Sequence, residues 1–589
     1  MVVFGVCPAD RIAYPPSPPA PLIAHRMADP ATASADELAA VAPDALTSAA
    51  TSAATAVVSA SAARPSGYVY AWGRGEFCLG VAPTAMDATH ICPFAAKVLG
   101  PATGSLSAAK TSKEKTSSSS SAAPRAASAR GAGSASSVPL RCVQVACGES
   151  MSAAVAVDGA LWTWGSGAGG RLGHGTVENH PRPFRVGGLL LTHRVFQVSA
   201  GEAHAGCVVE AGLAFTWGKG NKGALGDGIG EAHQQLEPKL VCRKPRVGNP
   251  GGPVPLQNLH FIDCSYQNTA VISRAGDCFV WGASDHGKLG LGAVTPTLWP
   301  TRLVLSAGEP AATAAASVSA VSSSSSSSTA PALSLHSLCL GSSFSGFVTC
   351  SGQLFMCGYG KAGNLGQGNR VSTLRPVLVS ALAGHHVVSV SCTRGQITVV
   401  AGGDVEGCEQ PHTLVVTADG RCFSFGTAHK GMLGNMKMKT LSPKGCDELL
   451  PYELGGTCRD AAGERSGYLG GMHVRGAVAS HIHSAVLGTW SAQAASAASS
   501  SSSSAASADS DSPRTCEVLT FGCGSDGRMG VRRYMEGLSG GRSRLKCYVS
   551  QPSPVVGLQG RRVLQIQSAR RHMVALVEEG GCSSKAGEA

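Results

Sequence analysis

The chain has 589 residues and a formal net charge of +11 at pH 7, which permits an acidic partner without requiring one. Charged residues make up only 14% and glycines number 75, which favours many short strands and tight turns over long surface helices. Because there is no C-x-x-C pair among 21 cysteines, no secretory signal and no apolar run that could span a bilayer, we expect an intracellular protein, cytoplasmic or nuclear, without a zinc ribbon.

Composition divides the chain into a repetitive region and several low-complexity segments. Residues 1–65 are rich in Ala, Pro and Ser without periodicity, and we expect a disordered arm there. Serine-rich stretches at about 102–137, 306–332 and 491–513 have the same character. They interrupt repeats, so we interpret them as disordered loop insertions in one folded unit, residues 66–582, followed by a tail at 583–589.

The stretch TWGKGNKGALGDG, residues 216–228, contains the spacing G-x-G-x-x-G of a dinucleotide-binding loop. That motif should occur once, and it should open a helix whose N-terminus holds the pyrophosphate. Here three more glycines follow where the helix should begin, and related loops occur seven times in the chain. The loop is therefore interpreted as a turn within a structural repeat, and the sequence indicates no cofactor.

The repeated turn follows an aromatic residue in most copies. The aromatic positions are Trp72, Trp164, Trp217, Trp281, Phe425 and Phe521, and Cys357 takes this place in one copy. A Leu or Met follows eight residues later in six copies, as in Trp164 to Leu172. The glycines that we assign to the turn as structural residues are Gly165, Gly173, Gly218, Gly226, Gly282 and Gly290. We expect them to supply positive φ angles or close backbone approach, and we expect the tryptophans to pack between repeats.

The full repeat is longer than the turn. Its clearest copy, VQVACGESMSAAVAVDGALWTWGSGAGGRLGHG at residues 143–175, predicts three strands, with an Asp158-Gly159 hairpin turn between the second and third. A later FRV segment suggests a fourth strand. Four antiparallel strands in each unit of about 50 residues predict the blades of an all-β propeller.

The two ends of the repetitive region complement each other. Residues 563–581 contain the first two strands of a repeat, and residues 67–73 contain the third without the preceding pair. Together they make one blade. The sequence therefore predicts a seven-bladed β-propeller of four-stranded antiparallel blades, closed by pairing the C-terminal strands with the N-terminal strand.

This repeat resembles that of the regulator of chromosome condensation family, across most of residues 67–581 outside the insertions. The resemblance implies a seven-bladed propeller. It also implies protein partners, because the founding member is an exchange factor for the small GTPase Ran that docks on nucleosomes, and most relatives are scaffolds, ubiquitin-ligase modules or adaptors. The exchange factor extends one loop into a wedge, and the short glycine-turn loops here contain no counterpart. We therefore expect a non-enzymatic interaction scaffold, with an exchange factor for a Ran-like GTPase and chromatin association as the alternative.

Two groups of polar residues were weighed as sites. The histidines His204, His412, His483 and His572 follow the first turn of different repeats, so we expect local hydrogen bonding rather than metal binding. The sequence indicates no metal site, and no catalytic nucleophile with its base. A basic interface is the remaining candidate, formed by Arg528, Arg532, Arg533, Arg561, Arg562, Arg570 and Arg571. Such runs are often solvated loops, and they support nucleic acid or chromatin binding only weakly.

Overall fold

The computed structural model describes residues 64–74, 79, 91–98, 140–245, 253–305, 332–394, 411–435, 447–455, 457–460, 463–466, 469–490, 516–524, 527–531 and 548–578. The segments expected to be disordered fall outside these ranges, except for residues 64, 65 and 332. Arg64 was assigned to the arm, but its guanidinium donates to the carbonyl of Phe196 at 2.7 Å and stacks over that ring. Contacts of the folded unit therefore begin at Arg64.

Five sheets contain four antiparallel strands each. They are β7–β10 (Val195–Ala200, His204–Val209, Ala214–Lys219, Gln234–Leu240), β11–β14 (Leu259–Cys264, Asn268–Ser273, Cys278–Gly282, Thr297–Leu303), β15–β18 (Leu335–Leu340, Phe344–Thr349, Leu354–Gly358, Thr373–Leu378), β19–β22 (Val387–Cys392, His412–Thr417, Cys422–Gly426, Glu448–Glu453) and β25–β28 (Met472–Ala479, His483–Trp490, Cys516–Cys523, Tyr548–Pro554). A short hairpin, β23 (Thr457–Asp460) with β24 (Gly463–Ser466), lies between the last two sheets in sequence.

The remaining eight strands form one sheet that consists of two blades. One blade is β3–β6 (Arg141–Cys147, Met151–Ala156, Leu161–Gly165, His180–Arg185). The other combines the two ends of the chain: β29 (Val563–Ser568), β30 (His572–Val577), β1 (Gly67–Arg74) and β2 (Ile91–Lys97). Within the described residues, backbone pairing between the two blades is limited to Gly67 with Cys142 and Tyr68 with Arg141. The structure thus contains the seven predicted blades.

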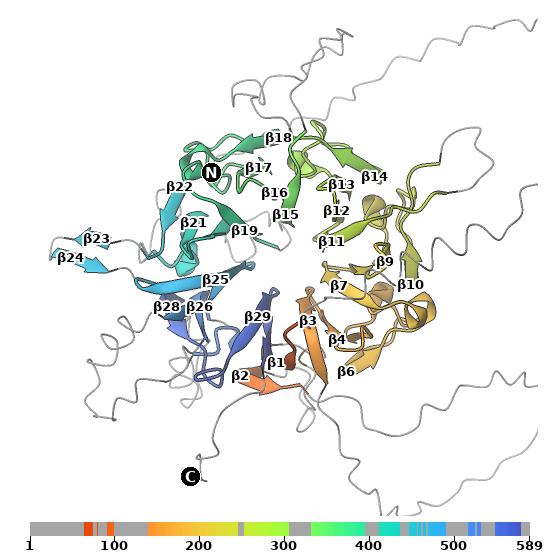
Figure 1. Ribbon diagram of the computed structural model, residues 1–589, viewed down its shortest axis with the longest axis horizontal. Coiled ribbons are helices and arrows are strands. Elements are labelled where there is room, and N and C mark those ends of the chain that lie inside the picture. Colours follow the sequence, from red (N-terminus) through yellow and green to blue (C-terminus); the bar gives the residue numbers. More distant parts are fainter. Residues whose placement is uncertain are drawn as a thin grey trace, which may run out of the picture. The chain divides into compact units, whose positions relative to one another are not determined.

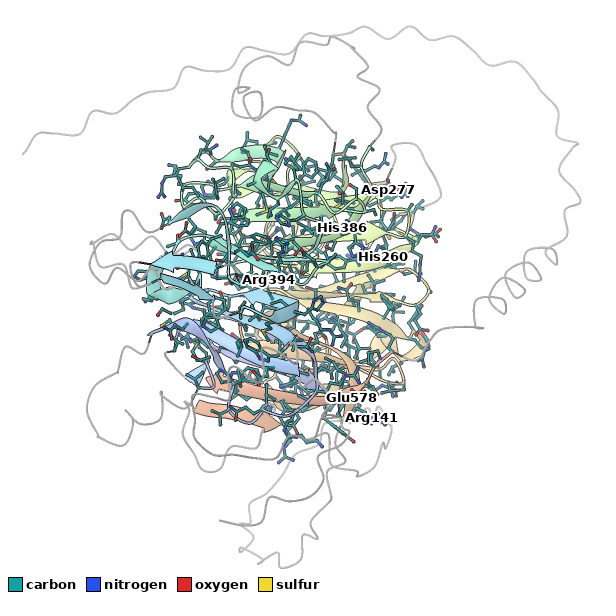
Figure 2. The ribbon with its side chains drawn as sticks, turned by 60° about the vertical axis from the view of Figure 1, so that its left-hand side comes forward. Arg141, His260, Asp277, His386, Arg394 and Glu578 are labelled. Atoms are coloured by element: carbon teal, nitrogen blue, oxygen red, sulfur yellow. The ribbon has the colours of Figure 1, made fainter. Side chains whose placement is uncertain are left out.

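The ring closes as the sequence predicts. Strand β1 pairs antiparallel with β30, in continuous register from Tyr68 opposite Val577 to Gly73 opposite His572. The first strands of the blades, β3, β7, β11, β15, β19, β25 and β29, each contact the next around a complete circuit, and Figure 1 shows them surrounding the centre. Arg141 and Glu578, labelled in Figure 2, mark the ends of β3 and β30 in this closing region.

The first strands of neighbouring blades do not pair with one another, and glutamine side chains connect three neighbouring pairs. The Gln144 amide donates to the carbonyl of Val198 at 2.9 Å and accepts from its N–H at 2.8 Å. Gln197 makes the same two bonds to Ile262 on the following blade. Gln565 accepts from the Val145 N–H at 3.0 Å, so one such bond crosses the point of closure.

The apolar core lies between the blades. The buried apolar residues of the described chain form seven clusters, one for each contact between adjacent blades. One cluster joins Trp72 on β1 to Val518 on β27, and another joins Trp164 on β5 to Val574 on β30. Short 3-10 helices occupy loops between the strands, namely η1 (Ala168–Gly170), η2 (Gly188–Thr192), η3 (Asn221–Gly223), η4 (Asp285–Gly287), η5 (Ser380–Leu382) and η6 (His429–Gly431). Among the described residues, no helix has the length and apolar character needed to cross a membrane.

Candidate functional site

The repeated aromatic residues hold neighbouring blades together. Trp217 is fully buried, and its indole N–H donates to the carbonyl of Arg171, in the glycine-turn loop of the preceding blade, at 2.9 Å. A Cβ on Gly173 of that loop would lie 2.9 Å from the indole nitrogen, so only glycine lets the ring approach. Trp72 and Trp281 make the same kind of bond. Phe425 and Phe521 likewise cover the glycines at 366 and 434.

The glycine that follows the aromatic residue has a different task. Gly218 has φ of 104°, and a Cβ on it would lie 2.6 Å from the carbonyl oxygen of Ala203, because strand β9 passes directly over the β7–β8 turn. Gly165 and Gly282 have the same geometry. Gly226 repeats the role of Gly173, whereas Gly290 faces Pro376. These loops are occupied by protein packing, which agrees with the structural interpretation of the repeat.

In four blades a hydroxyl group on the strand before the loop donates to a carbonyl at the far end of the loop. Thr163 Oγ1, beside Trp164, donates to the carbonyl of Leu172 at 2.7 Å, and Thr216 does the same to Leu225 at 2.9 Å. This bond spans nine residues in each case. It supports the constant interval between the aromatic residue and the leucine in these blades, whereas two further blades keep the interval with Val280 or Met356 in place of the hydroxyl residue.

The four repeated histidines make hydrogen bonds between blades. His204 Nε2 lies 2.9 Å from Thr269 Oγ1, and His572 Nε2 lies 3.1 Å from Ser152 Oγ, each on the next blade. His412 and His483 reach serine hydroxyls in the same way. Burial lowers the pKa of His204 and of His572 to about 4, so both are neutral at physiological pH. Their local hydrogen-bonding role is confirmed.

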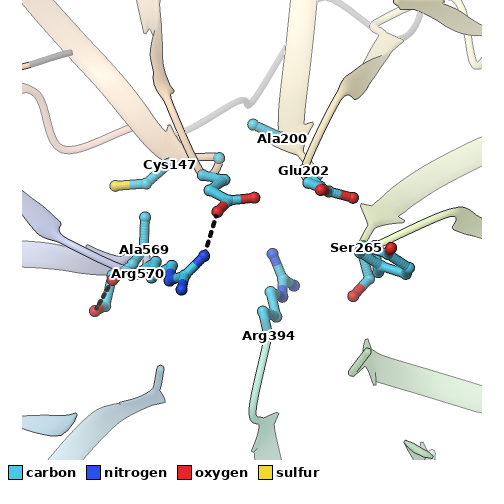
Figure 3. Close-up of a pocket in the computed structure, with 12 residues that line it drawn as sticks. Cys147, Ala200, Glu202, Ser265, Arg394, Ala569 and Arg570 are labelled. Carbon is cyan, nitrogen blue, oxygen red and sulfur yellow. Dashed lines mark hydrogen bonds and ion pairs between the residues drawn. The ribbon is translucent and has the colours of Figure 1, made fainter. Parts of the chain in front are cut away.

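A channel of about 260 Å³ runs between the first strands of the seven blades. Its wall includes the bridging glutamines, several serines, and Cys147, Arg394 and Ser568. The same three residues also line a recess of about 40 Å³ at one end of the strands, so the recess is the mouth of the channel. Figure 3 shows this mouth, with side chains from separate blades pointing toward a common space.

The mouth is built from one repeated position. Each first strand is followed by a turn or loop, and the second residue after the strand varies in size and charge around the ring. In chain order these seven residues, which we call the mouth ring, are Glu149, Glu202, Tyr266, Ser342, Arg394, His481 and Arg570. The acidic members lie on the blades of β3 and β7, and the basic arginines lie on those of β19 and β29. The two glutamates are therefore on adjacent blades, and Arg570 lies beside Glu149 across the point of closure.

Ion pairs organise the charges of the mouth. Arg570 pairs with Glu149 at 3.0 Å across the closing blades, and Arg394 pairs with the buried Asp263 of β11. Burial, followed by the nearby Glu149 carboxylate, raises the pKa of Glu202 to about 7. The hydroxyl of Ser265 also lines the mouth, is buried, and has no hydrogen-bond partner within the part of the chain that the structure describes.

The structure separates the arginines of the predicted basic interface. Arg570 and Arg571 follow β29, whereas Arg561 and Arg562 precede it, and six residues of strand span about 20 Å. The two pairs consequently lie at opposite ends of the strand, and only Arg570 lines the mouth. Arg528 is 4% exposed, and its guanidinium donates to the carbonyl of Arg570 at 2.8 Å. The arginines at positions 532 and 533 lie outside the described residues.

Glu149, Glu202 and Arg394 were not singled out from the sequence. The sequence nevertheless contains a pattern that could have identified them. Each occupies the second position after a first strand, and equivalent positions of a ring converge on its axis. This pattern is visible only when the repeats are compared position by position and closure of the ring is assumed. Arg394 was further concealed because the next strand, β20, begins only at His412.

Comparison with known proteins identifies related sequences over parts of the chain. The model of the regulator of chromosome condensation (RCC1) repeat matches residues 158–208 and 351–400. The ultraviolet-B receptor UVR8 of Arabidopsis thaliana is 27% identical over 329 residues, which are 55% of this chain and 60% of the receptor. The human E3 ubiquitin-protein ligase HERC2 is 31% identical over 258 residues, 42% of this chain and 4% of the ligase. Both matches therefore cover less than two thirds of the relative.

Solved structures share the fold across most of the chain. Human WBSCR16 has a TM-score of 0.53 at 16% identity, with 87% of this chain and 99% of that chain covered. Yeast RCC1 (Prp20), in its complex with Kap60, has a TM-score of 0.56 at 14% identity and covers 88% of this chain and 90% of its own. At such identities the likeness shows the propeller fold and nothing about activity.

Proposed function

Because the chain belongs to the RCC1-repeat family, we propose that it is a non-enzymatic protein-interaction scaffold whose partner contacts the face bearing the channel mouth. The observation that carries this proposal is the mouth ring: seven residues at one repeated position that differ in size and charge, with glutamates on two adjacent blades and arginines on two others. A partner of complementary charge would be oriented by this arrangement as well as attracted by it.

The size of the mouth favours a macromolecular partner over a small substrate. Pockets for small-molecule ligands usually measure about 300–1,000 Å³. The recess holds about 40 Å³ and the channel behind it about 260 Å³. A protein surface that covers the rim needs no larger cavity, and it could place one polar side chain beside Ser265.

Proteins with this fold provide indirect support. The structure of yeast Prp20p was described together with its binding to Gsp1p and histones, and another structure contains Kap60 bound to the same protein. HERC2 is a ubiquitin ligase, in which the matched segment is 4% of the protein. A compartment inside the cell is part of the proposal, because twelve cysteines of the described residues are free thiols and ten of these twelve are buried.

Paired substitutions test which face binds. The variant Glu149→Gln with Arg570→Gln removes an ion pair at the mouth without changing the net charge. The matched control, Arg562→Gln with Glu578→Gln, removes a pair of 2.7 Å at the opposite end of the same blade. After cross-linking in intact cells, capture with quantitative mass spectrometry should recover stoichiometric partners with the parent protein and the control, and lose them with the mouth variant. Equal recovery with both variants, or no stoichiometric partner at all, would contradict the proposal.

The alternative function is nucleotide exchange on a Ran-like small GTPase with chromatin association, and the similarity to yeast RCC1 is what favours it. Release of labelled GDP from a panel of small GTPases distinguishes the two functions. Acceleration by catalytic amounts of the chain would establish exchange. A partner that binds stoichiometrically, without any change in GDP release, would support the scaffold.

A further inference from the structure

Two cysteines from neighbouring blades meet in the wall of the channel. Cys339 lies on β15 and Cys392 on β19, and the backbone N–H of Cys392 donates to Cys339 Sγ at 3.3 Å. Both are free thiols, 5% and 0% exposed. The two strands belong to different sheets, so no backbone ladder joins the blades at this point.

The surroundings make the two thiols unequal. The pKa of the Cys339 thiol is lowered, mainly by a hydrogen bond from the Cys392 side chain. Burial acts to raise this pKa, whereas the guanidinium of Arg394, 3.9 Å from the sulfur, acts to lower it. Burial raises the pKa of the Cys392 thiol well above its usual range. Asp263 holds Arg394 in place through their ion pair. Cys339 thus has the setting of a thiolate nucleophile, with a protonated thiol beside it.

The channel supplies access. Cys339 lines the space of about 260 Å³, and Arg394 lines both this space and its mouth. A hydrogen peroxide molecule is about the size of two waters, so the channel can hold it.

We propose that Cys339 and Cys392 form an oxidation site, at which a small hydroperoxide that enters the channel converts the two thiols into a disulfide between blades. In the first step the Cys339 sulfur attacks one peroxide oxygen, the O–O bond breaks, and one water leaves after protonation. Cys339 is then a sulfenic acid. In the second step the Cys392 sulfur attacks the Cys339 sulfur, the S–O bond breaks, and the Cys392 proton leaves with the oxygen as a second water. The two thiols lose two electrons and the peroxide gains them.

The chain contains its own comparison pair. Cys207 on β8 and Cys264 on β11 also come from adjacent blades, and they are close enough for charge on Cys264 to raise the pKa of Cys207. Both are fully buried, and burial raises both pKa values. Neither lines the channel or its mouth. Hydrogen peroxide should therefore leave this pair reduced.

The experiment treats the reduced full-length protein with increasing hydrogen peroxide and maps its thiols by mass spectrometry without reduction. Digestion with trypsin and chymotrypsin separates Cys339 from Cys350, and Cys392 is the one cysteine between Arg370 and Arg394. We expect a linked peptide containing Cys339 and Cys392 at peroxide concentrations at least tenfold below those that modify Cys207. Similar sensitivity of the two pairs, or formation of the link only in urea, would overturn the proposal.

Single variants establish the order of the two steps. In Cys392→Ser the sulfenic acid at Cys339 has no thiol to attack it, so dimedone should label Cys339 after peroxide treatment. In Cys339→Ser, Cys392 should stay unlabelled. Circular dichroism and the melting temperature before oxidation show whether each variant is folded, and dimedone labelling is compared only between folded proteins. Equal labelling in the two variants would contradict the assigned roles, and peroxidation of the parent protein to Cys339 sulfinic acid without a link would exclude the disulfide.

Discussion

Replacing Trp217 by alanine tests whether the repeated aromatic residues hold the blades together. The side chain is fully buried between the blades of β3–β6 and β7–β10, and its indole N–H makes the bond to the Arg171 carbonyl. Loss of a buried tryptophan costs about 3–5 kcal/mol, and a carbonyl left unpaired adds about 1 kcal/mol or more. Trp217→Phe should cost only about 1–2 kcal/mol, because Phe425 and Phe521 already fill the same place in other blades.

The measurement is urea unfolding followed by far-ultraviolet circular dichroism, with tryptophan fluorescence as a second probe of cooperativity. Trp299→Ala is the matched control, because Trp299 on β14 is only half-buried. We expect Trp299→Ala and Trp217→Phe to lower the free energy of unfolding by similar amounts. Trp217→Ala should lower it by a much larger amount. If Trp217→Ala unfolds at the same urea concentration as the control, the aromatic position does not hold the blades together and the interpretation of the repeat fails.

Three further predictions follow from closure, from the glycine turns and from the mouth. Deleting residues 563–589 removes β29 and β30 and should give an insoluble or strongly destabilised chain, whereas deleting 1–60 should leave the melting temperature unchanged; equal melting of the two would refute closure. In urea unfolding, Gly218→Ala should lower the free energy of unfolding by about 2 kcal/mol or more. Gly476→Ala, whose added Cβ would meet nothing within 4 Å, should lower it by under about 1 kcal/mol. The pKa of Glu202 is raised from 4.5 to about 7, so the folded state binds the proton of this carboxyl more tightly than the unfolded state does. As pH rises from 4.5 to 7, the protein should therefore lose about 1–2 kcal/mol of stability relative to Glu202→Gln. A stability difference between the two proteins that is independent of pH would contradict this.

The fold could be predicted from the sequence because its cause is local and repeated. The hydroxyl, aromatic residue, glycine and leucine around Trp164 form contacts that recur at Trp217, so an interpretation that is correct for one copy carries over to the next. The incomplete copies at the two ends then required a closed ring. The basic interface, by contrast, was drawn from neighbours in the sequence. A strand takes Arg562 and Arg570 to opposite ends of a blade, and packing buries Arg528, and neither effect is visible in charge alone.

The division between repeated and variable positions indicates where this chain acquires its function. In two blades the residue that precedes the mouth-ring residue is a glycine, Gly148 or Gly201. A Cβ at either position would lie within 2.4 Å of a carbonyl oxygen of the next blade, so the backbones are in close contact there. The backbone at the mouth is therefore fixed by packing that does not depend on the ring side chains. Those side chains are free to differ, and they do, from Glu149 to Arg570. In a protein built from copies, the positions that share a backbone and differ in chemistry are those that a partner can select, and we therefore propose the mouth, rather than the glycine loops, as the interaction surface.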